Sequence, residues 1–262
     1  MSKKTKESLK IVSQERIGKD IYSMWLQADH MAAEAKPGQF LSLYTRDGSK
    51  LLPRPISICE IDRENGRIRL VYRVTGKNTG TEAFSRLHAG VPVEVLGPLG
   101  NGFPLHEAEG KRVFLMGGGI GIPPMLQTAK ELNGTKTAIL GYRDELFLND
   151  EFQAYADVCV ATEDGSTGTK GNVMDAIREN ALEADVIFAC GPTQMLRAIK
   201  TYAEENKILC AGISMEERMD LRRWGLSWPV CANQRRSTAI PHVHNKRICK
   251  DGPVFLSTEV EL

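Results

Sequence analysis

The stretch VFLMGGGIGIPPM (113–125) joins a continuous apolar run to a cluster of glycines and two prolines. An uninterrupted apolar run is typical of a strand that is covered on both faces of a parallel sheet. Glycines directly after such a strand let the backbone approach a phosphate, and the next helix offers its N-terminal N–H groups to the negative charge. Pro123 and Pro124 suit the start of that helix, because the first helical residues need no N–H partner. The stretch predicts a nucleotide-binding turn. Its spacing is not the usual G-x-G-x-x-G, and a turn without a ligand is the alternative.

The sequence on the carboxyl side of this turn alternates between strands and helices. Apolar runs predict strands at 113–116, 137–141, 158–161 and 186–189. Helical patterns lie between or after them, at 124–132, 172–180 and 192–205. Strands that alternate with helices indicate a parallel sheet covered on both faces. Residues 103–212 are therefore predicted to form an α/β domain.

The sequence before the turn has a different pattern, that of a small β-barrel. Short apolar runs are separated by Gly, Pro, Asn and Asp at the spacing expected of such a fold. They predict six strands, at 9–13, 22–27, 40–44, 56–59, 67–74 and 91–96, and one short helix at 81–87. Residues 1–102 are therefore predicted to form a six-stranded antiparallel barrel.

The carboxyl edge of the predicted sheet carries the first group of candidate site residues. Open parallel sheets bind ligands off the carboxyl ends of their strands, which places Cys190 near Gly117. A thiol at this edge is able to pack against a nicotinamide ring, although a buried Cys is more often an inert small hydrophobe. The candidates here are Gly117, Gly118, Gly119, Gly121, Cys190, Gly191 and Pro192.

A second group of candidates lies in the predicted barrel. Arg54 opens one strand shortly before Ser57, Tyr72 lies at the end of another, and Gly80 and Thr81 lead into the short helix. Together they supply a cation, hydroxyls, an aromatic face and a helix N-terminus, which suit an anionic dinucleotide with a planar ring. The alternative is that an Arg at a barrel edge is simply a solvated strand residue.

Length and composition exclude several classes of protein. The 262 residues suit two domains and a tail, and 34 basic against 33 acidic side chains give a net charge of +1. This balance gives no reason to expect nucleic acid or an anionic membrane as a partner. The N-terminus is basic but lacks the apolar core of a signal peptide, so we expect a cytoplasmic protein. The six cysteines are too scattered for a disulfide framework and are expected to be thiols or ligands.

Several motifs, in order along nearly the whole chain, resemble the ferredoxin reductase superfamily. They are PGQF (37–40), RPISI (54–58), YRV (72–74), NTGT (78–81), LGPLGNGF (96–103), GGGIGIPPM (117–125) and CGP (190–192). Within this superfamily, the chain is similar to the electron transfer subunits of type B dihydroorotate dehydrogenases. The motifs that carry this closer similarity are GPLGNGF (97–103), EDGSTGTKG (163–171), ISMEERM (213–219) and ICKDGPVF (248–255).

The resemblance implies three parts: an FAD-binding barrel at 1–102, an NAD-binding α/β domain at 103–212 and a C-terminal [2Fe-2S] segment at 213–262. The residues implied to contact FAD are Arg54, Pro55, Ile56, Ser57, Val71, Tyr72, Arg73, Val74, Gly80 and Thr81. The residues implied to contact NAD are Gly117, Gly118, Gly119, Gly121, Gly191 and Pro192, with Cys190 near the nicotinamide.

The function implied by the resemblance is electron transfer in pyrimidine biosynthesis. Dihydroorotate would be oxidised on a separate FMN-containing catalytic subunit, in a heterotetramer with two of each chain, and electrons would pass through [2Fe-2S] and FAD to NAD+. One alternative is an NAD(P)H-dependent flavin or ferredoxin reductase of the same superfamily that lacks the cluster. Another is a nucleic-acid-binding module on the basic, Trp-containing tail. Arg143 leaves the choice between NAD and NADP open, because a guanidinium suits a 2′-phosphate.

The cluster segment departs from the resemblance at its ligands. The first three cysteine ligands would fall at positions that hold Leu221, Leu226 and Pro229 in this chain. Cys249 remains in place, and Cys231 lies nearby but out of register. A plant-type [2Fe-2S] cluster takes four thiolates, which two cysteines do not supply.

Three interpretations of this segment compete. The cluster is lost, or a zinc ion is held by Cys231, His242, His244 and Cys249, although their spacing matches no common zinc site. The third interpretation is a reading-frame error. Residues 221–250 contain no Asp or Glu, and LRRWGL (221–226) read one nucleotide later can encode Cys-Gly-Val-Gly-Ala-Cys, although a second shift is needed for the third cysteine. No function is therefore inferred from residues 220–241.

Overall fold

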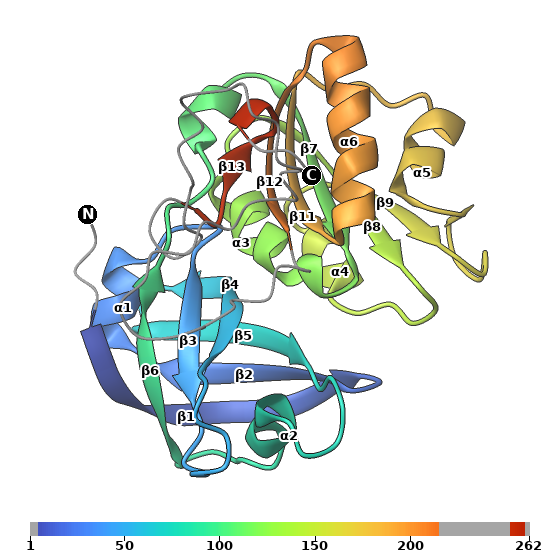
Figure 1. Cartoon of the computed structure of the whole chain (residues 1–262). Coiled ribbons are helices and arrows are strands. Elements are labelled where there is room, and N and C mark those ends of the chain that lie inside the picture. The colour runs from blue at the N-terminus through green and yellow to red at the C-terminus, as the bar shows by residue number, and fades with distance from the viewer. Residues whose placement is uncertain (1–4, 215–251, 260–262) are drawn as a thin grey trace, which may run out of the picture.

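The computed structural model of the chain describes residues 5–214 and 252–259, which form a β-barrel packed beside an α/β domain (Figure 1). The barrel closes in the strand order β1-β2-β5-β4-β3-β6, and every neighbouring pair is antiparallel. Its strands are β1 (Thr5–Gly18), β2 (Ile21–Gln27), β3 (Phe40–Tyr44), β4 (Arg54–Asp62), β5 (Arg67–Arg73) and β6 (Pro92–Leu99). The predicted six-stranded antiparallel barrel is confirmed.

The barrel elements follow the sequence pattern with differences at their ends. β1 starts four residues before the predicted run, because residues 5–10 pair with β6 and close the barrel. Helix α2 (Gly80–Ser85) begins after Thr79, whose side-chain oxygen accepts from the backbone N–H of Glu82 at 3.2 Å. This is an N-cap contact, which stabilises the first helical turn. Helix α1 (Asp29–Glu34) was not predicted.

The α/β domain contains a seven-stranded sheet in the order β10-β9-β8-β7-β11-β12-β13. The strands are β7 (Arg112–Gly118), β8 (Thr135–Tyr142), β9 (Asp157–Thr162), β10 (Thr169–Lys170), β11 (Val186–Gly191), β12 (Leu209–Ser214) and β13 (Phe255–Leu256). All are parallel except β13, which runs antiparallel to β12. The helices are α3 (Pro123–Glu131), α4 (Asn149–Gln153), α5 (Val173–Glu179) and α6 (Thr193–Asn206), with 3-10 turns at η1 (Leu105–Ala108), η2 (Gly119–Gly121) and η3 (Ser257–Glu259). The predicted parallel sheet is therefore confirmed.

Alternate side chains of the sheet strands pack on its two faces. Leu115 and Phe188 belong to one core cluster, and Phe114 and Ile187 belong to another on the opposite face. Three barrel residues join the first cluster: Ile21, Cys59 and Val71. The barrel and the α/β domain therefore share one continuous apolar core, which holds the two parts together.

The C-terminal segment differs from the expectation at both of its ends. Instead of a separate part beginning at residue 213, the chain continues through β12 to Ser214 and returns as β13 in the same sheet. Asn101, after β6, donates its backbone N–H to the carbonyl of Gly252 at 2.6 Å and exchanges two side-chain hydrogen bonds with the backbone of Val254, at 2.7 and 3.0 Å. Strands β12 and β13 extend the sheet beyond β11, whose edge would otherwise be unpaired. Residues 215–251 lie outside the described residues.

None of the helices in the described ranges is long and apolar enough to cross a bilayer.

Candidate functional site

The carboxyl edge of the sheet brings the predicted turn and the end of β11 together. Gly117 of β7 pairs with Cys190 of β11 on one side and with Leu140 of β8 on the other. From Gly118 the chain continues through η2 into α3. The turn therefore lies where open parallel sheets place their ligands.

Two glycines of this turn have different physical roles. A Cβ on Gly121 would lie 2.2 Å from the carbonyl oxygen of Cys190, so the absence of a side chain lets the turn pack directly on β11. Gly119 has a φ of +53°, which favours glycine, and a Cβ there would meet no atom within 4 Å. Gly121 is therefore a packing residue, and Gly119 is the residue that faces open space.

Gly119 borders a cleft of about 210 Å³ between the barrel and the α/β domain. The cleft is lined by the β1–β2 turn, the end of β5 and the residues after β8: Lys19, Asp20, Ile21, Arg73, Val74, Gly119, Tyr142, Arg143, Asp144, Glu145 and Phe147. Arg73 and Val74 come from the barrel group of candidates, and Gly119 comes from the sheet group. One cleft therefore joins the two groups that the sequence analysis treated separately.

Arg54, a barrel candidate that does not line this cleft, lies against the start of α2. Its Nη1 donates to the carbonyl of Leu52 at 2.9 Å, and a Cβ on Gly80 would lie 2.9 Å from Arg54 Nε. The hydroxyl of Thr81 accepts from the backbone N–H of Thr75 at 3.3 Å. The structure therefore brings Arg54 and the start of α2 together, and a charged donor in this position suits a phosphate.

The remaining barrel candidates divide between the two faces of their strands. Ile56 is buried in the barrel core, whereas Ser57 is half-buried and Pro55 is exposed. Val71 points to the opposite side of the barrel wall, into the core shared with the α/β domain. Side chains alternate along a strand, so only part of each motif is able to face a ligand.

Tyr72, which the sequence predicts to offer an aromatic face to a nucleotide, is buried. It lies on the inner side of β5 and is 2% exposed, because neighbouring strand residues alternate between the two faces. Its hydroxyl donates to Oε1 of Gln14 at 2.9 Å, and its ring stacks on Tyr22 with centroids 5.9 Å apart. Burial raises the pKa of the Tyr72 hydroxyl. The Tyr72 ring is a core group of the barrel.

Comparison with known proteins agrees with this geometry. Residues 8–103 match the family described as the oxidoreductase FAD-binding domain. The chain is also 40% identical over 265 residues to the dihydroorotate dehydrogenase B (NAD(+)), electron transfer subunit, of Bacillus mycoides, with 98% of this chain and 99% of the relative covered. The chain belongs to this family. The electron transfer subunit of Bacillus cereus is equally similar, at 40% identity with the same coverage.

Solved structures share the architecture of this chain. An NADH-dependent reduced ferredoxin-NADP oxidoreductase matches with a TM-score of 0.74 and 27% identity, over 97% of this chain and 89% of that chain. A cytochrome P450 reductase from Amycolatopsis matches with a TM-score of 0.66 and 19% identity, over 79% of this chain and 68% of that chain. The second likeness shows the fold alone.

Cys190, which the resemblance to this family places near a nicotinamide, is fully buried at the end of β11. Burial raises the pKa of its thiol, so the group is neutral at ordinary pH. Beside it, Gly191 and Gly118 both lie against Met195: a Cβ on either would come within 2.6 Å of a Met195 side-chain atom. Pro192 is exposed and precedes α6. The role of Cys190 near a nicotinamide stays a prediction, and its thiol is a packing group beneath the turn.

The residues expected to bind a metal, Cys231 and Cys249, lie outside the described residues, as do His242 and His244. Within residues 5–214 and 252–259, no group of three or more His, Cys, Asp or Glu side chains is arranged to hold a metal ion. The described cysteines are free thiols at Cys59, Cys159, Cys190 and Cys210. The cysteines of the described ranges therefore form no candidate metal site.

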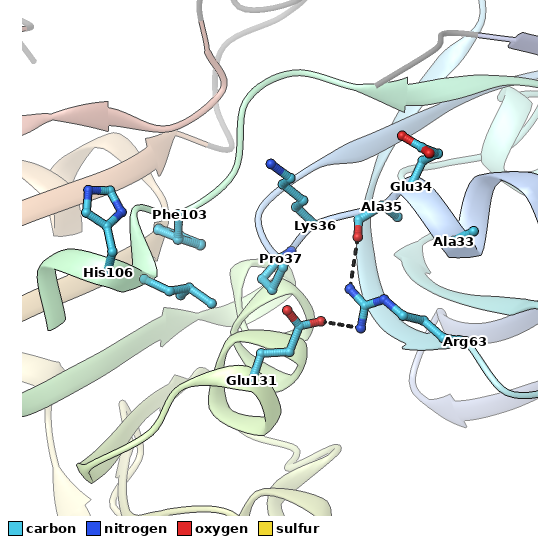
Figure 2. Close-up of a pocket in the computed structure, with 10 residues that line it drawn as sticks. Ala33, Glu34, Ala35, Lys36, Pro37, Arg63, Phe103, His106 and Glu131 are labelled. Atoms are coloured by element: carbon cyan, nitrogen blue, oxygen red, sulfur yellow. Dashed lines mark hydrogen bonds and ion pairs between the residues drawn. The ribbon is translucent and has the colours of Figure 1, made fainter. Parts of the chain in front are cut away.

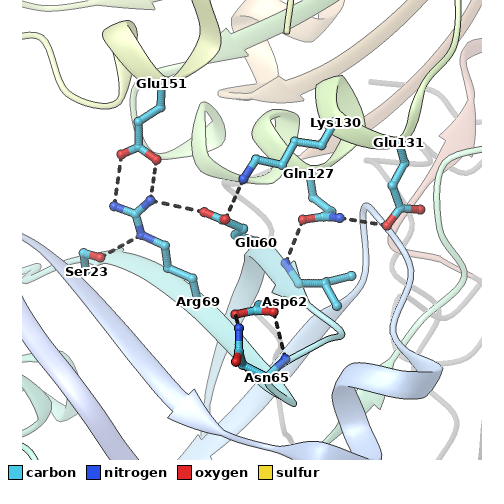
Figure 3. Close-up of polar contacts among 10 residues, drawn as sticks. Ser23, Glu60, Asp62, Asn65, Arg69, Gln127, Lys130, Glu131 and Glu151 are labelled. Carbon is cyan, nitrogen blue, oxygen red and sulfur yellow. Dashed lines mark hydrogen bonds and ion pairs between the residues drawn. The ribbon is translucent and has the colours of Figure 1, made fainter. Parts of the chain in front are cut away.

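Sequence reasoning missed a polar network between the barrel and the α/β domain (Figure 3). Arg69 of β5 forms two hydrogen bonds to Glu151 of α4, at 2.6 and 3.1 Å. Glu60 of β4 pairs with Lys130 of α3 at 2.5 Å and with Arg69 at 3.3 Å. The signal was present in RIRLVYR (67–73), where Arg69 interrupts the apolar core of a strand. An Arg on a buried strand needs a partner, but its partner's position requires the fold.

A second cavity lies at the domain junction, beside the loop after β6 (Figure 2). It has a volume of about 450 Å³ and is lined by Ala33, Glu34, Ala35, Lys36, Pro37, Arg63, Phe103, Leu105, His106 and Glu131. Arg63 spans it, with a hydrogen bond to the carbonyl of Ala35 at 3.0 Å and an ion pair with Glu131 at 2.8 Å. None of the candidate nucleotide-binding residues lines this cavity, so the cleft beside Gly119 is the better candidate site.

Proposed function

We propose that the chain is the electron transfer subunit of an NAD+-linked dihydroorotate dehydrogenase, in pyrimidine biosynthesis. In this family assignment dihydroorotate is oxidised on a separate FMN-containing catalytic subunit, and the step that the described residues of this chain support is the transfer between FAD and NAD+. The proposed assembly is a cytoplasmic heterotetramer with two of each chain. The observation that carries the proposal is the cleft in which Arg73 and Val74 of the barrel lie with Gly119 of the sheet. The family membership supports it over the whole chain.

The barrel residues fit FAD at its phosphate end. Gly80 leaves the space that the Arg54 side chain occupies, since a Cβ there would lie 2.9 Å from Nε, and the guanidinium is thereby held at the start of α2. A charged donor of this kind forms strong hydrogen bonds with phosphate oxygens. FAD, when bound, supplies the exchange between single electrons and a hydride. Arg54 would hold the cofactor at this end, and strands β4 and β5 would position the other barrel residues that contact it.

The turn residues fit the pyrophosphate of NAD. Gly119 presents bare backbone to the cleft, and nothing lies within 4 Å of the position its Cβ would take. The neutral thiol of Cys190 neither donates a full charge nor acts as a base, so its proposed role is to shape the floor beneath the nicotinamide. The choice of NAD over NADP rests on the family, in which the named relatives are NAD(+) proteins.

The residues of the C-terminal segment do not fit a [2Fe-2S] cluster. The sequence supplies Cys231 and Cys249 where four thiolates are needed. We therefore propose no electron path through a cluster in this chain. The absent cysteines favour a second candidate function, an NAD(P)H-dependent flavin or ferredoxin reductase that works without one.

Two measurements on the purified chain test the proposal. The chain should bind one FAD, shown by flavin absorbance after gel filtration, and NADH should bleach that absorbance. A colourless protein after incubation with FAD would contradict both candidate functions.

The coupling to a partner separates the two candidates. With dihydroorotate and the catalytic subunit, the chain as it stands should not reduce NAD+. The triple variant Leu221→Cys, Leu226→Cys and Pro229→Cys should bind about two iron atoms and gain coupling. A triple variant that binds iron and sulfide but remains uncoupled would favour the independent reductase.

A further inference from the structure

Arg69 is an unusual residue in the barrel wall, because it is charged and 6% exposed. Its Nη1 and Nη2 donate to the two carboxylate oxygens of Glu151, and its Nε donates to the hydroxyl of Ser23 at 2.9 Å. Burial lowers the pKa of Arg69, but the hydrogen bond to Glu151 and the nearby carboxylates raise it by more. The guanidinium is therefore charged and fixed in direction by hydrogen bonds from all three of its nitrogens.

Glu151, the partner of Arg69, belongs to helix α4. Residues 143–148 run from the end of β8 to the start of α4, and several of them line the cleft, so this segment is called the cleft wall. Glu151 follows within the first turn of α4. One side of α4 is held by Phe152, which is fully buried in the shared core. The other tie is the charged contact between Glu151 and the barrel.

The cleft wall is also attached to the barrel at its other end. Oε2 of Glu145 accepts from the backbone N–H of Lys19, in the β1–β2 turn, at 2.8 Å. Within the wall, the hydroxyl of Tyr142 donates to the carbonyl of Phe147 at 2.9 Å. The barrel therefore holds this segment through Lys19, which lines the cleft, and holds the adjoining α4 through Arg69.

This arrangement matters for transfer between two nucleotides. Efficient transfer needs the reacting atoms about 3 to 3.5 Å apart, and a misplacement of roughly 1 Å can cost a hundredfold in rate. Barrel candidates and sheet candidates reach the same cleft from separate domains, so their alignment depends on contacts between those domains.

We propose that Arg69 and Glu151 are positioning residues that hold the cleft wall and the two domains in the alignment that hydride transfer requires. This inference rests on the proposed function, since it assumes FAD on the barrel and NAD in the cleft. Neither residue touches the cleft itself. They act through α4 and the wall at residues 143–148.

The test compares the FAD-loaded full-length chain with the variants Arg69→Lys, Glu151→Gln and the double variant. Lys keeps the charge but cannot form the two-pronged contact with a carboxylate. The matched control is Arg112→Lys, because Arg112 also bonds two carboxylates, Glu183 at 2.7 Å and Asp185 at 2.9 Å, but lies within the α/β domain and is half exposed. Flavin content and Tm establish that each variant is folded and loaded.

Stopped-flow reduction by NADH supplies the readout. We expect the limiting rate of flavin reduction to fall at least tenfold in Arg69→Lys and Glu151→Gln, with the apparent Kd for NADH changed less than threefold. The deuterium isotope effect with NADH labelled at the transferred hydrogen should rise, because transfer itself becomes slower. The double variant should be no slower than the worse single variant, since both changes break the same contact. Arg112→Lys should reduce at the parent rate.

Two outcomes would overturn the inference. One is a limiting rate within twofold of the parent in both single variants. The other is an equal loss in Arg112→Lys, which would assign the effect to general destabilisation. If the parent chain itself binds no FAD or is not reduced by NADH, the proposed function fails instead.

Discussion

The barrel meets the α/β domain in two regions that differ in character. Away from the cleft lining, β4 and β5 are fastened to α3 and α4 by polar groups: Arg69 with Glu151, Glu60 with Lys130, and the backbone N–H of Ile61 with Oε1 of Gln127 at 2.7 Å (Figure 3). At the cleft, the same two domains leave about 210 Å³ between Arg73 and Gly119. The domains are therefore joined at contacts separate from the cleft lining, so the cleft stays open without weakening the contacts between the domains.

The largest expected effect is at the edge of the cleft, where the turn packs on β11. Gly121→Val puts side-chain atoms on the carbonyl of Cys190, 2.2 Å from the Cβ position, and the backbone has no room to yield. We expect loss of soluble folded protein, measured by expression and by the far-UV CD melting curve. Gly48→Val, where a Cβ meets nothing within 4 Å, is the control. A folded Gly121→Val protein would mean that the turn is not packed as described.

The next largest expected effect is on stability, and it tests the polar contacts between strands β4 and β5 and helices α3 and α4. Arg69→Met removes the cation that Glu151 and Glu60 share, while Glu60 keeps its ion pair with Lys130. Arg69 is buried but Glu151 is 40% exposed, so we expect the free energy of unfolding to fall by about 1 to 3 kcal/mol. Urea unfolding should show a lower midpoint with an unchanged m-value. Arg112→Met, which removes an exposed set of ion pairs, should change the midpoint little, because solvent screens such pairs. Equal shifts in the two variants would remove the distinction between buried and exposed contacts.

The next prediction concerns FAD binding: Arg54→Ala should weaken the retention of FAD. The loss of a charge-assisted hydrogen bond costs about 1.5 to 3 kcal/mol, which is roughly ten- to hundredfold in Kd. Fluorescence titration of the apoprotein with FAD measures the change. Arg178→Ala, which removes an exposed ion pair on α5, should bind FAD as the parent does. Unchanged affinity in Arg54→Ala would show that the guanidinium meets no phosphate.

A smaller change distinguishes the two glycines of the turn. Gly119→Ala adds a methyl group facing the cleft and should raise the apparent Kd for NADH several-fold while FAD stays bound. The positive φ costs about 1 kcal/mol for an alanine. Gly110→Ala controls for this cost, because Gly110 has a φ of +69° and open space but lies away from the cleft. If both variants weaken NADH binding equally, the effect comes from backbone strain.

The smallest expected effect is the loss of thermal stability on removing the exposed ion pair between Arg112 and Asp185, and this loss depends on pH. Hydrogen bonds from the Arg112 side chain and backbone lower the pKa of Asp185 from 3.8 to about 2. A lowered pKa stabilises the folded state above the unfolded pKa, and that contribution is lost as the pH falls toward 2. Asp185→Asn should therefore melt slightly below the parent at pH 5, and the difference should shrink between pH 4 and pH 2. High salt should also reduce the difference. A difference that grows with acid would contradict the sign.

The sequence predicted the elements that carry strong local patterns. The strand 40–44 is reproduced residue for residue, and the helix expected at 172–180 begins at its Asn172 cap, whose side chain accepts from the N–H groups of Met174 and Asp175. The glycine turn was also found, because glycines after an apolar run are a local signal. These features depend on contacts among near neighbours, which a sequence displays directly.

Features set by distant contacts were not predicted. Tyr72 was expected to face a ligand, but strand register turns it toward Gln14 inside the barrel. The partner of Arg69 lies 82 residues away in α4, and no local pattern connects them. Gly119 and Gly121 look alike in sequence, and only the carbonyl of Cys190 separates their roles. Tertiary packing decides all three.

Because β12 pairs with β13, we expect the chain to tolerate changes in the length of the sequence between these two strands. β12 ends at Ser214, and β13 pairs with the same strand, with Gly212 opposite Phe255. The sequence between them therefore begins and ends at neighbouring points of one sheet. The entropy of closing a flexible connection between two such points grows slowly, with each doubling of its length costing only about 0.6 kcal/mol. Changing the length of the sequence at 215–251 is therefore expected to leave the barrel and the sheet folded. Such freedom would let one scaffold acquire or discard a redox module without redesign of the rest.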